Sequence, residues 1–346
     1  MPTIIKKLWN YFVKSYSYFH RKKISYGFPE IYTLELTNHC AMSCRMCPHD
    51  LMKRSRGFMS FETFKKVIDQ IKPYANRDLC IHGIGDSLLH PDLREFVRYA
   101  KSKNISLRVS TNPISLTEKS SHILIEEELD HLFISLDGIN PETYRYLRGE
   151  PANYQQALKR IQYFIDLKKA LKKKKPYIEI SMIRLKETEK EVEEFKKKWE
   201  TSGVDNVLIK AFKTWDGSIQ SIKELASPDQ LSDVARQKER YSCIRPWLII
   251  SILWDGRVVP CCYDYDAKYV IGSVNEESIK EIWNNKKMQE LRRTLTDADF
   301  TANKLCASCI EGEGAPPSRI YPLDIVRKLF ELKPNKIITY FFKRST

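Results

Sequence analysis

The 346-residue sequence lacks an apolar run long enough to cross a bilayer, since its longest, near Trp247–Trp254, is far shorter than the roughly 20 residues of a spanning helix. It also lacks the apolar core of a secretory signal, because Lys6, Lys7 and Lys14 interrupt the N-terminal apolar residues. We therefore expect a cytoplasmic protein. In that reducing compartment the nine cysteines favour metal-bound thiolates over a disulfide framework.

Acidic residues are scarce at both ends of the chain. The net charge is +14, yet residues 1–23 hold six Lys/Arg and no acid, and residues 319–346 hold seven Lys/Arg against two acids. The basic charge is therefore a property of two terminal arms, residues 1–30 and 319–346. No recognised nucleic-acid-binding motif accompanies it, so we expect no nucleic acid partner.

The N-terminal arm combines this charge with apolar and aromatic residues at helical spacing. One predicted helical face comprises Ile4, Ile5, Leu8, Phe12, Tyr16 and Phe19. Such a helix either docks on the rest of the protein or lies on an anionic membrane surface, and the pattern leaves both open. In the second case the protein would be peripheral at the inner face of the membrane.

Strand-like and helix-like segments alternate between residues 31 and 212. Strands are predicted at 31–37, 79–84, 105–110, 131–136, 177–183 and 206–211. Helices are predicted at 60–72, 91–103, 117–127, 153–171 and 189–202. This alternation indicates an α/β fold built of βα units around a parallel sheet.

Three cysteines follow the first predicted strand with the spacing Cys40-x3-Cys44-x2-Cys47. Closely spaced thiolates suit a soft metal centre. Zinc would require a fourth ligand, which His39 or His49 could supply, whereas a [4Fe–4S] cluster held by three cysteines leaves one iron open. The spacing alone leaves iron–sulfur, zinc and incidental buried thiols as alternatives.

A second cysteine group lies beyond residue 212. Asp255-Gly256 separates two apolar runs and predicts a hairpin. Helices are predicted at 228–240 and 278–293. The cysteines of this region are Cys243, Cys261, Cys262, Cys306 and Cys309. A Cys-x2-Cys pair with two distant cysteines is typical of a zinc or iron–sulfur site.

The spacing of Cys40, Cys44 and Cys47 resembles the signature of the radical S-adenosylmethionine (SAM) enzymes. This resemblance implies a partial (β/α)6 TIM-like barrel over residues 31–215 and a [4Fe–4S] cluster on these cysteines. It also implies that the open iron binds SAM. An electron from a flavodoxin- or ferredoxin-type reductant then yields a 5′-deoxyadenosyl radical that abstracts hydrogen from the substrate.

Further short sequence segments, at the ends of the predicted strands, resemble the SAM-binding segments of that family. Gly83-Ile84-Gly85-Asp86 is similar to its Gly-Gly-Glu-Pro segment, with Asp86 and Ser87 in place of Glu and Pro, and Thr111-Asn112 is similar to its Thr-Asn-Gly turn. Met46 stands where an aromatic residue is usual. The SAM contacts implied are Met46, Gly83, Gly85, Asp86, Thr111, Asn112, Ser135 and Arg184.

Residues 216–318 resemble the SPASM/Twitch extension of radical SAM enzymes, in a short layout similar to that of the 2-deoxy-scyllo-inosamine dehydrogenases. The resemblance implies a small auxiliary domain, a β-hairpin plus a helix. It also implies that a second [4Fe–4S] cluster is held by Cys243, Cys261, Cys306 and Cys309. Cys262 is left as a neighbouring thiol, an alternative ligand or a hydrogen donor to the substrate, and is the only tentative catalytic residue.

A fully ligated second cluster suits electron transfer. We therefore expect oxidation of a secondary alcohol on a small-molecule substrate, a sugar or cyclitol, free or lipid-linked. The alternatives are a radical epimerase in which Cys262 returns a hydrogen, a peptide-modifying maturase, and a zinc-bearing binding protein without catalysis.

Overall fold

The computed structural model of the protein describes residues 3–74, 78–226 and 243–309. The strands are β1 (Glu30–Leu34), β2 (Asp78–Ile81), β3 (Ser106–Thr111), β4 (His131–Ser135), β5 (Tyr177–Arg184), β6 (Asn206–Ala211), β7 (Ile249–Ile252), β8 (Arg257–Val259) and β9 (Gly272–Ser273). The predicted helix at 228–240 and the C-terminal arm, 319–346, lie outside the described residues.

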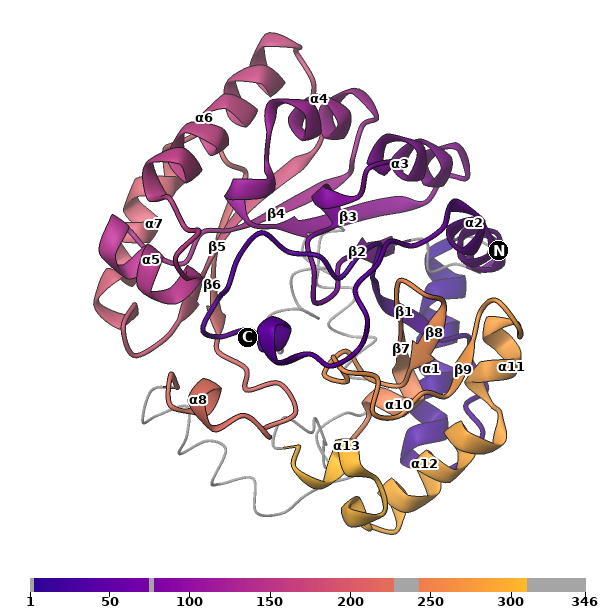
Figure 1. The fold of residues 1–346 in the computed structure, drawn as a ribbon. Coiled ribbons are helices and arrows are strands. Elements are labelled where there is room, and N and C mark those ends of the chain that lie inside the picture. The colour runs from indigo at the N-terminus through magenta and orange to yellow at the C-terminus, as the bar shows by residue number, and fades with distance from the viewer. Residues whose placement is uncertain (1–2, 75–77, 227–242, 310–346) are drawn as a thin grey trace.

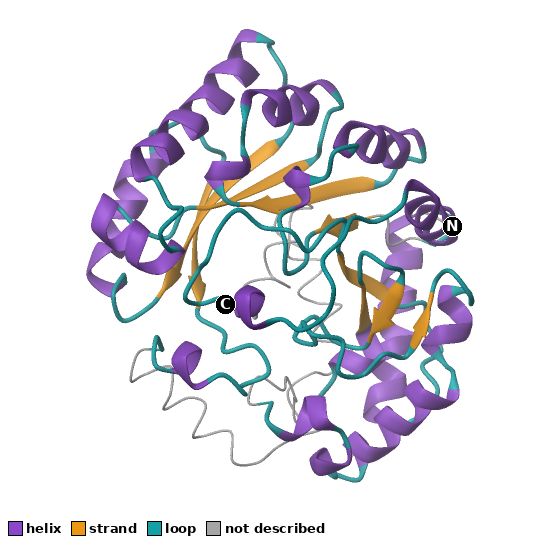
Figure 2. Cartoon of the chain, in the orientation of Figure 1, coloured by secondary structure: helices purple, strands orange, loops and turns teal. Residues whose placement is uncertain are grey.

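Most of the helices lie on the outer side of the curved sheet, whereas α8 and α13 lie across its open side (Figure 1 and Figure 2). They are α1 (Thr3–Phe19), α2 (Phe61–Ile71), α3 (Leu93–Ser102), α4 (Glu118–Glu126), α5 (Pro141–Arg148), α6 (Tyr154–Ala170), α7 (Val192–Glu200), α8 (Gln220–Lys223), α10 (Arg245–Leu248), α11 (Ile279–Trp283), α12 (Lys286–Thr296) and α13 (Lys304–Ala307). Among the described residues, none of these helices has the length and apolar character needed to cross a membrane.

The described strands form one sheet in the order β6-β5-β4-β3-β2-β1-β7-β8-β9. All pairs from β6 to β7 are parallel, and the hairpin pairs β7–β8 and β8–β9 are antiparallel. The sheet curves into a partial barrel (Figure 1), which confirms the predicted fold class. The predicted hairpin therefore extends the barrel sheet, because β7 pairs with β1 across more than 200 residues of sequence.

Alternating burial along β3 and β4 separates the side chains of the core from those that face the barrel interior. On β3, Leu107 and Val109 are fully buried and pack in the main apolar core, whereas Arg108 and Ser110, the residues that follow each of them, are only half-buried. Since successive side chains of a strand point to opposite faces, Arg108 and Ser110 face away from that core. Polar residues on this second face can meet a ligand inside the barrel.

Two features differ from the sequence prediction. Helix α5 was not predicted, although Asn140 caps its N-terminus by accepting from the backbone N–H of Thr143 and Gly149 ends it. The helix predicted at 278–293 is two helices, α11 and α12. The break falls where Asn284 ends the first and the Asn285 side chain caps the second by accepting from the Met288 N–H.

Candidate active site

The loop bearing Cys40, Cys44 and Cys47 follows β1 and is held by the end of α5. The Arg45 N–H donates to the Leu147 carbonyl at 3.0 Å. Gly149 approaches so closely that a Cβ there would lie 2.5 Å from the Ser43 carbonyl oxygen, and its φ of +86° favours glycine. The unpredicted helix α5 therefore fixes the backbone of the cysteine loop.

The three cysteines of this loop are half-buried and lie close to one another. Burial raises the pKa of Cys40 to about 12 and also raises the pKa of Cys44 and of Cys47; neighbouring thiols add to the shift of Cys40 and Cys47, and nearby carboxylates add to that of Cys44. Arg148, which pairs with the buried Asp137, also donates to the Cys44 sulfur at 3.6 Å. A metal must therefore displace protons here, and three soft donors on one loop fit an iron–sulfur cluster.

Within the described residues, no group of three or more His, Cys, Asp or Glu side chains is arranged to hold a metal ion.

Three of the predicted SAM contacts meet at the ends of β2 and β3. Both Asp86 carboxylate oxygens accept from the Thr111 hydroxyl, at 3.0 and 2.8 Å, and Oδ2 accepts from the Asn112 side chain at 2.7 Å. Burial raises the pKa of Asp86, against these hydrogen bonds. The Asp86 N–H donates to the His39 carbonyl at 2.8 Å, so this polar group also contacts the cysteine loop.

The two predicted glycines lie against the same loop. A Cβ on Gly85 would lie 2.4 Å from the Thr37 carbonyl oxygen, and a Cβ on Gly83 would lie 2.6 Å from Cγ of Glu35. The absence of a side chain therefore lets the segment after β2 pack directly on the segment after β1.

The remaining predicted contacts are dispersed. Met46 is buried in a small apolar cluster with Leu147 and Phe212, and its carbonyl accepts from the Trp215 indole at 2.9 Å. The Ser135 carbonyl accepts from Arg148 at 2.9 Å. Arg184 is half-exposed and pairs with Glu189, with Nε 2.6 Å from the carboxylate. Their assignment as SAM contacts stays a prediction.

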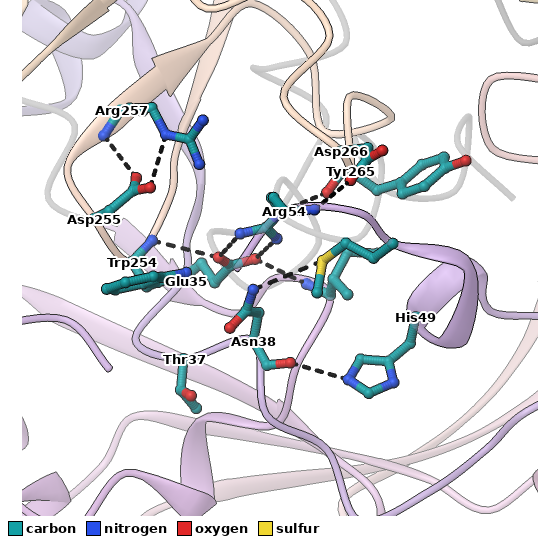
Figure 3. Close-up of polar contacts among 12 residues, drawn as sticks. Glu35, Thr37, Asn38, His49, Arg54, Trp254, Asp255, Arg257, Tyr265 and Asp266 are labelled. Atoms are coloured by element: carbon teal, nitrogen blue, oxygen red, sulfur yellow. Dashed lines mark hydrogen bonds and ion pairs between the residues drawn. The ribbon is translucent and has the colours of Figure 1, made fainter. Parts of the chain in front are cut away.

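A buried ion pair, not anticipated from the sequence, joins the cysteine loop to the hairpin (Figure 3). Arg54 donates to both oxygens of Glu35, at 2.6 and 2.5 Å, and its Nε donates to the Tyr265 carbonyl at 2.7 Å. Glu35 also accepts from the N–H groups of Ile84 and Trp254, each at 3.3 Å. One carboxylate thus ties β1, the segment after β2 and the hairpin together.

The cysteines of the second group also lie near one another. Burial raises the pKa of the Cys306 thiol, with electrostatic contributions from Cys243, Cys309 and Cys261, which places these four side chains near one another. The loop after Cys261 is bound to the first loop, because the Lys53 and Arg54 N–H groups donate to Asp266 at 2.7 and 2.9 Å. The two cysteine groups therefore lie on directly connected loops.

Cys262 lies beside this second group. Its sulfur accepts from the Arg245 guanidinium at 3.1 Å, and the hydrogen bond between Cys261 and Cys262, together with burial, raises the pKa of the Cys261 thiol. Arg245 stacks over the Tyr263 ring at 4.5 Å.

The inner face of the sheet carries a polar group that the sequence did not reveal. The Arg108 guanidinium and the Lys210 ammonium lie 5.3 and 5.2 Å from the centre of the Phe133 ring. Burial lowers the pKa of Lys210. Cys80 is half-buried beside both cations, and burial raises the pKa of its thiol. Alternate positions on neighbouring strands could have suggested this grouping, had the strand registers been known.

His82, on the same face, is held neutral. Its Nδ1 is buried and has no hydrogen-bond partner within the described residues. Burial, with a smaller contribution from Lys210, lowers the pKa of His82 from its usual 6.5 to about 4.

The free energy of unfolding should therefore fall by about 2 kcal/mol between about pH 7.5 and about pH 5 through His82 alone. The folded-state pKa is below the unfolded value, so the unfolded state gains the proton first, and this stability is present above pH 6.5 and lost toward pH 4. Thermal denaturation across this range should show a shallower pH dependence in His82→Asn. His20→Asn, at an exposed site, is the control and should follow wild type. Equal slopes in all three proteins would refute a neutral buried His82.

Two known families match the chain. The radical SAM superfamily matches residues 34–199, and the SPASM iron–sulfur cluster-binding domain matches residues 243–310. These two segments contain the first and second cysteine groups described above.

Relatives with this organisation differ in what they act on. The tungsten-containing aldehyde ferredoxin oxidoreductase cofactor-modifying protein of Pyrococcus furiosus is 24% identical over 311 residues, which cover 80% of this chain and 85% of the relative. The SAM-dependent 2-deoxy-scyllo-inosamine dehydrogenase of Niallia circulans is 23% identical over 281 residues, covering 80% and 90%. The structure of Streptococcus suis SuiB bound to the precursor peptide SuiA superposes with a TM-score of 0.61 at 13% identity, over 83% of this chain and 72% of SuiB, which shows a shared fold.

The chain therefore belongs to the radical SAM enzymes. Within them it is a member with a SPASM domain. Its cofactors are accordingly SAM, the [4Fe–4S] cluster of the radical SAM domain and further iron–sulfur ligation in the SPASM domain. Its layout resembles that of the 2-deoxy-scyllo-inosamine dehydrogenase.

Proposed function

We propose that this enzyme oxidises a secondary alcohol of a sugar or cyclitol, free or lipid-linked. When bound, the first cluster and SAM supply a hydrogen-abstracting radical, and the auxiliary cluster supplies an electron acceptor. Removal of one hydrogen atom, one electron and one proton from a carbinol leaves a ketone, so the reaction balances with these partners.

The observation that carries this proposal is the gathering of Cys243, Cys261, Cys306 and Cys309. Four cysteine ligands would saturate a cubane cluster and leave it no position for substrate, which suits electron transfer. Cys40, Cys44 and Cys47 would hold the first cluster with one iron open. The contacts of Lys53 and Arg54 with Asp266 support a short path between the two groups.

The polar side chains on the inner face of the sheet support the proposal that the substrate is rich in hydroxyl groups. Arg108 and Lys210 offer hydrogen-bond donors on either side of Phe133, whose ring can pack on an apolar sugar face. Lys210, whose pKa is lowered by burial, is our candidate to accept the carbinol proton at Nζ. Asp86, Thr111 and Asn112 form the polar group that we assign to SAM.

A one-electron donor must reach the first cluster, and we propose a flavodoxin- or ferredoxin-type protein. The exposed Arg45 lies on the cysteine loop, over the Tyr146 ring at 4.2 Å. Both residues line a surface hollow of about 680 Å³. Glu142 and the paired Arg145 and Glu150 also line it, so the hollow offers charges of both signs to a donor protein.

Replacing Cys306 and Cys309 together by Ala should block product formation while 5′-deoxyadenosine still forms. These cysteines belong to the second group, and SAM cleavage depends on the first. The measurement is anaerobic turnover with sugars, lipid-linked sugars and peptides, followed by mass spectrometry. A sugar or cyclitol product two hydrogens lighter supports the proposal, and a modified peptide alone would refute it.

Cys262→Ala separates oxidation from epimerisation. The Cys262 sulfur already accepts a hydrogen bond from the Arg245 guanidinium, and the proposed oxidation assigns it no step. An oxidase should therefore retain product formation in this variant. A product of unchanged mass that gains deuterium from D2O, made by wild type and lost in Cys262→Ala, would establish the epimerase instead.

A further inference from the structure

Helix α1 is fastened to the protein by one of its faces. Asn10 accepts from the Phe28 N–H at 2.7 Å and donates to the Phe28 carbonyl at 3.0 Å. Lys14 is fully buried and donates to Glu30 at 3.0 Å and to the Leu248 carbonyl at 3.2 Å. Tyr18 packs edge-on against Trp247, with ring centres 5.3 Å apart. The helix runs beside α10 in Figure 1, so its orientation is set by the barrel.

The opposite face of α1 is apolar and exposed. Leu8, Phe12 and Tyr16, one helical turn apart, are 37%, 41% and 42% exposed, and Trp9, stacked on Phe12, is 61% exposed. Ile24 and Tyr26 follow at 44% and 61%. Six of the eleven exposed large hydrophobic side chains in the described residues therefore belong to this N-terminal segment, which we call the α1 face (Leu8, Trp9, Phe12, Tyr16, Ile24 and Tyr26).

Basic residues flank the α1 face at both ends. Lys6 precedes it, and Arg21, Lys22 and Lys23 lie between its helical part and Ile24; all four are exposed. The chain has no acidic residue before Glu30, and that carboxylate pairs with Lys14. The lysines at the end of α6 and just after it differ, because Lys168, Lys173 and Lys175 each pair with an acidic side chain.

We propose that the α1 face binds the surface of a membrane containing anionic lipids, with its aromatic side chains at the boundary between headgroups and acyl chains. Aromatic and aliphatic side chains beside four exposed cations, one of which (Lys23) also lies near Glu290, form the pattern of an interfacial helix. A second copy of the chain would bring the same four cations face to face. The C-terminal arm, which carries seven Lys/Arg against two acids, would repel them likewise. An anionic surface complements both features.

Sedimentation of the full-length, anaerobically reconstituted enzyme with vesicles tests this proposal. Vesicles of equal phosphatidylglycerol and phosphatidylcholine should bind the wild type, and vesicles of phosphatidylcholine alone should bind it at least about tenfold more weakly. Raising the salt from about 0.1 M to about 0.5 M should weaken binding to the anionic vesicles, because screening shortens the range of the attraction.

Two variants and one matched control locate the surface. Trp9→Ser/Phe12→Ser should lower the affinity for anionic vesicles about tenfold or more. Arg21→Gln/Lys22→Gln/Lys23→Gln should lower it and remove most of the salt dependence. The control, Leu171→Ser/Tyr177→Ser, changes two side chains that are each 41% exposed beside the lysines after α6, and should bind as wild type does.

The outcomes distinguish a lipid surface from other partners of the α1 face. Vesicle binding is measured without turnover, so its result does not depend on the oxidation proposed above. Circular dichroism and iron content must match wild type for each variant. Vesicle binding that the α1-face variants leave unchanged, or equal binding to neutral vesicles, would overturn the proposal. A wild-type dimer in sedimentation equilibrium that Trp9→Ser/Phe12→Ser dissociates, without vesicle binding, would assign the face to a second copy.

Discussion

Replacing Cys40, Cys44 and Cys47 together by Ala should abolish formation of 5′-deoxyadenosine and remove about half of the iron, leaving about four atoms per chain of about eight. These cysteines supply every thiol of the first loop, and no SAM could be held on an open iron without them. The measurements are iron and sulfide analysis of anaerobically reconstituted protein and chromatography of the SAM-derived products. Continued 5′-deoxyadenosine formation would remove these cysteines from the role assigned to them.

The matched control for the iron analysis is Cys80→Ala. Cys80 is half-buried on β2, outside both cysteine groups, so its replacement should leave the iron content unchanged. Zinc in place of iron in the wild-type protein would favour the non-catalytic alternative.

Arg54→Met should lower the free energy of unfolding by about 3–5 kcal/mol, because it leaves the Glu35 carboxylate buried without its partner. For a chain of 346 residues, a loss of this size corresponds to a melting temperature lower by about 5 °C. Since Glu35 connects β1, the segment after β2 and the hairpin, product formation should fall further than 5′-deoxyadenosine formation does. Anaerobic thermal denaturation and product analysis give the two readouts.

Two further variants distinguish the charge from the packing. Arg56→Met, at an exposed site two residues away, should change neither readout. Glu35→Gln/Arg54→Met removes both charges and keeps an acceptor oxygen for the backbone N–H groups, so it should recover a large part of the lost stability. If the double variant is no more stable than Arg54→Met, unpaired charge is not the cause of the loss.

The elements of the barrel could be predicted from the sequence because their signals are local. Buried apolar residues alternate with half-buried ones along β3, and Ser60 caps α2 by accepting from the Thr63 N–H, so each element is specified by its own residues. The cysteine spacings are local in the same sense. Helix α5 was missed although Asn140 and Gly149 mark its ends, because eight residues give too short a window for a periodic pattern.

Only the tertiary structure decided which distant residues meet. The pairing of β7 with β1 makes the hairpin part of the barrel sheet, and no local pattern specifies a partner strand more than 200 residues away. Glu35 and Arg54, and likewise Asp137 and Arg148, read as ordinary charged residues until the packing of the loops buries them together. The sequence by itself determined the helices and strands and the cysteine sulfurs available as metal donors, since both depend on neighbouring residues. The grouping of those donors depends on long-range packing, which the folded chain alone specifies.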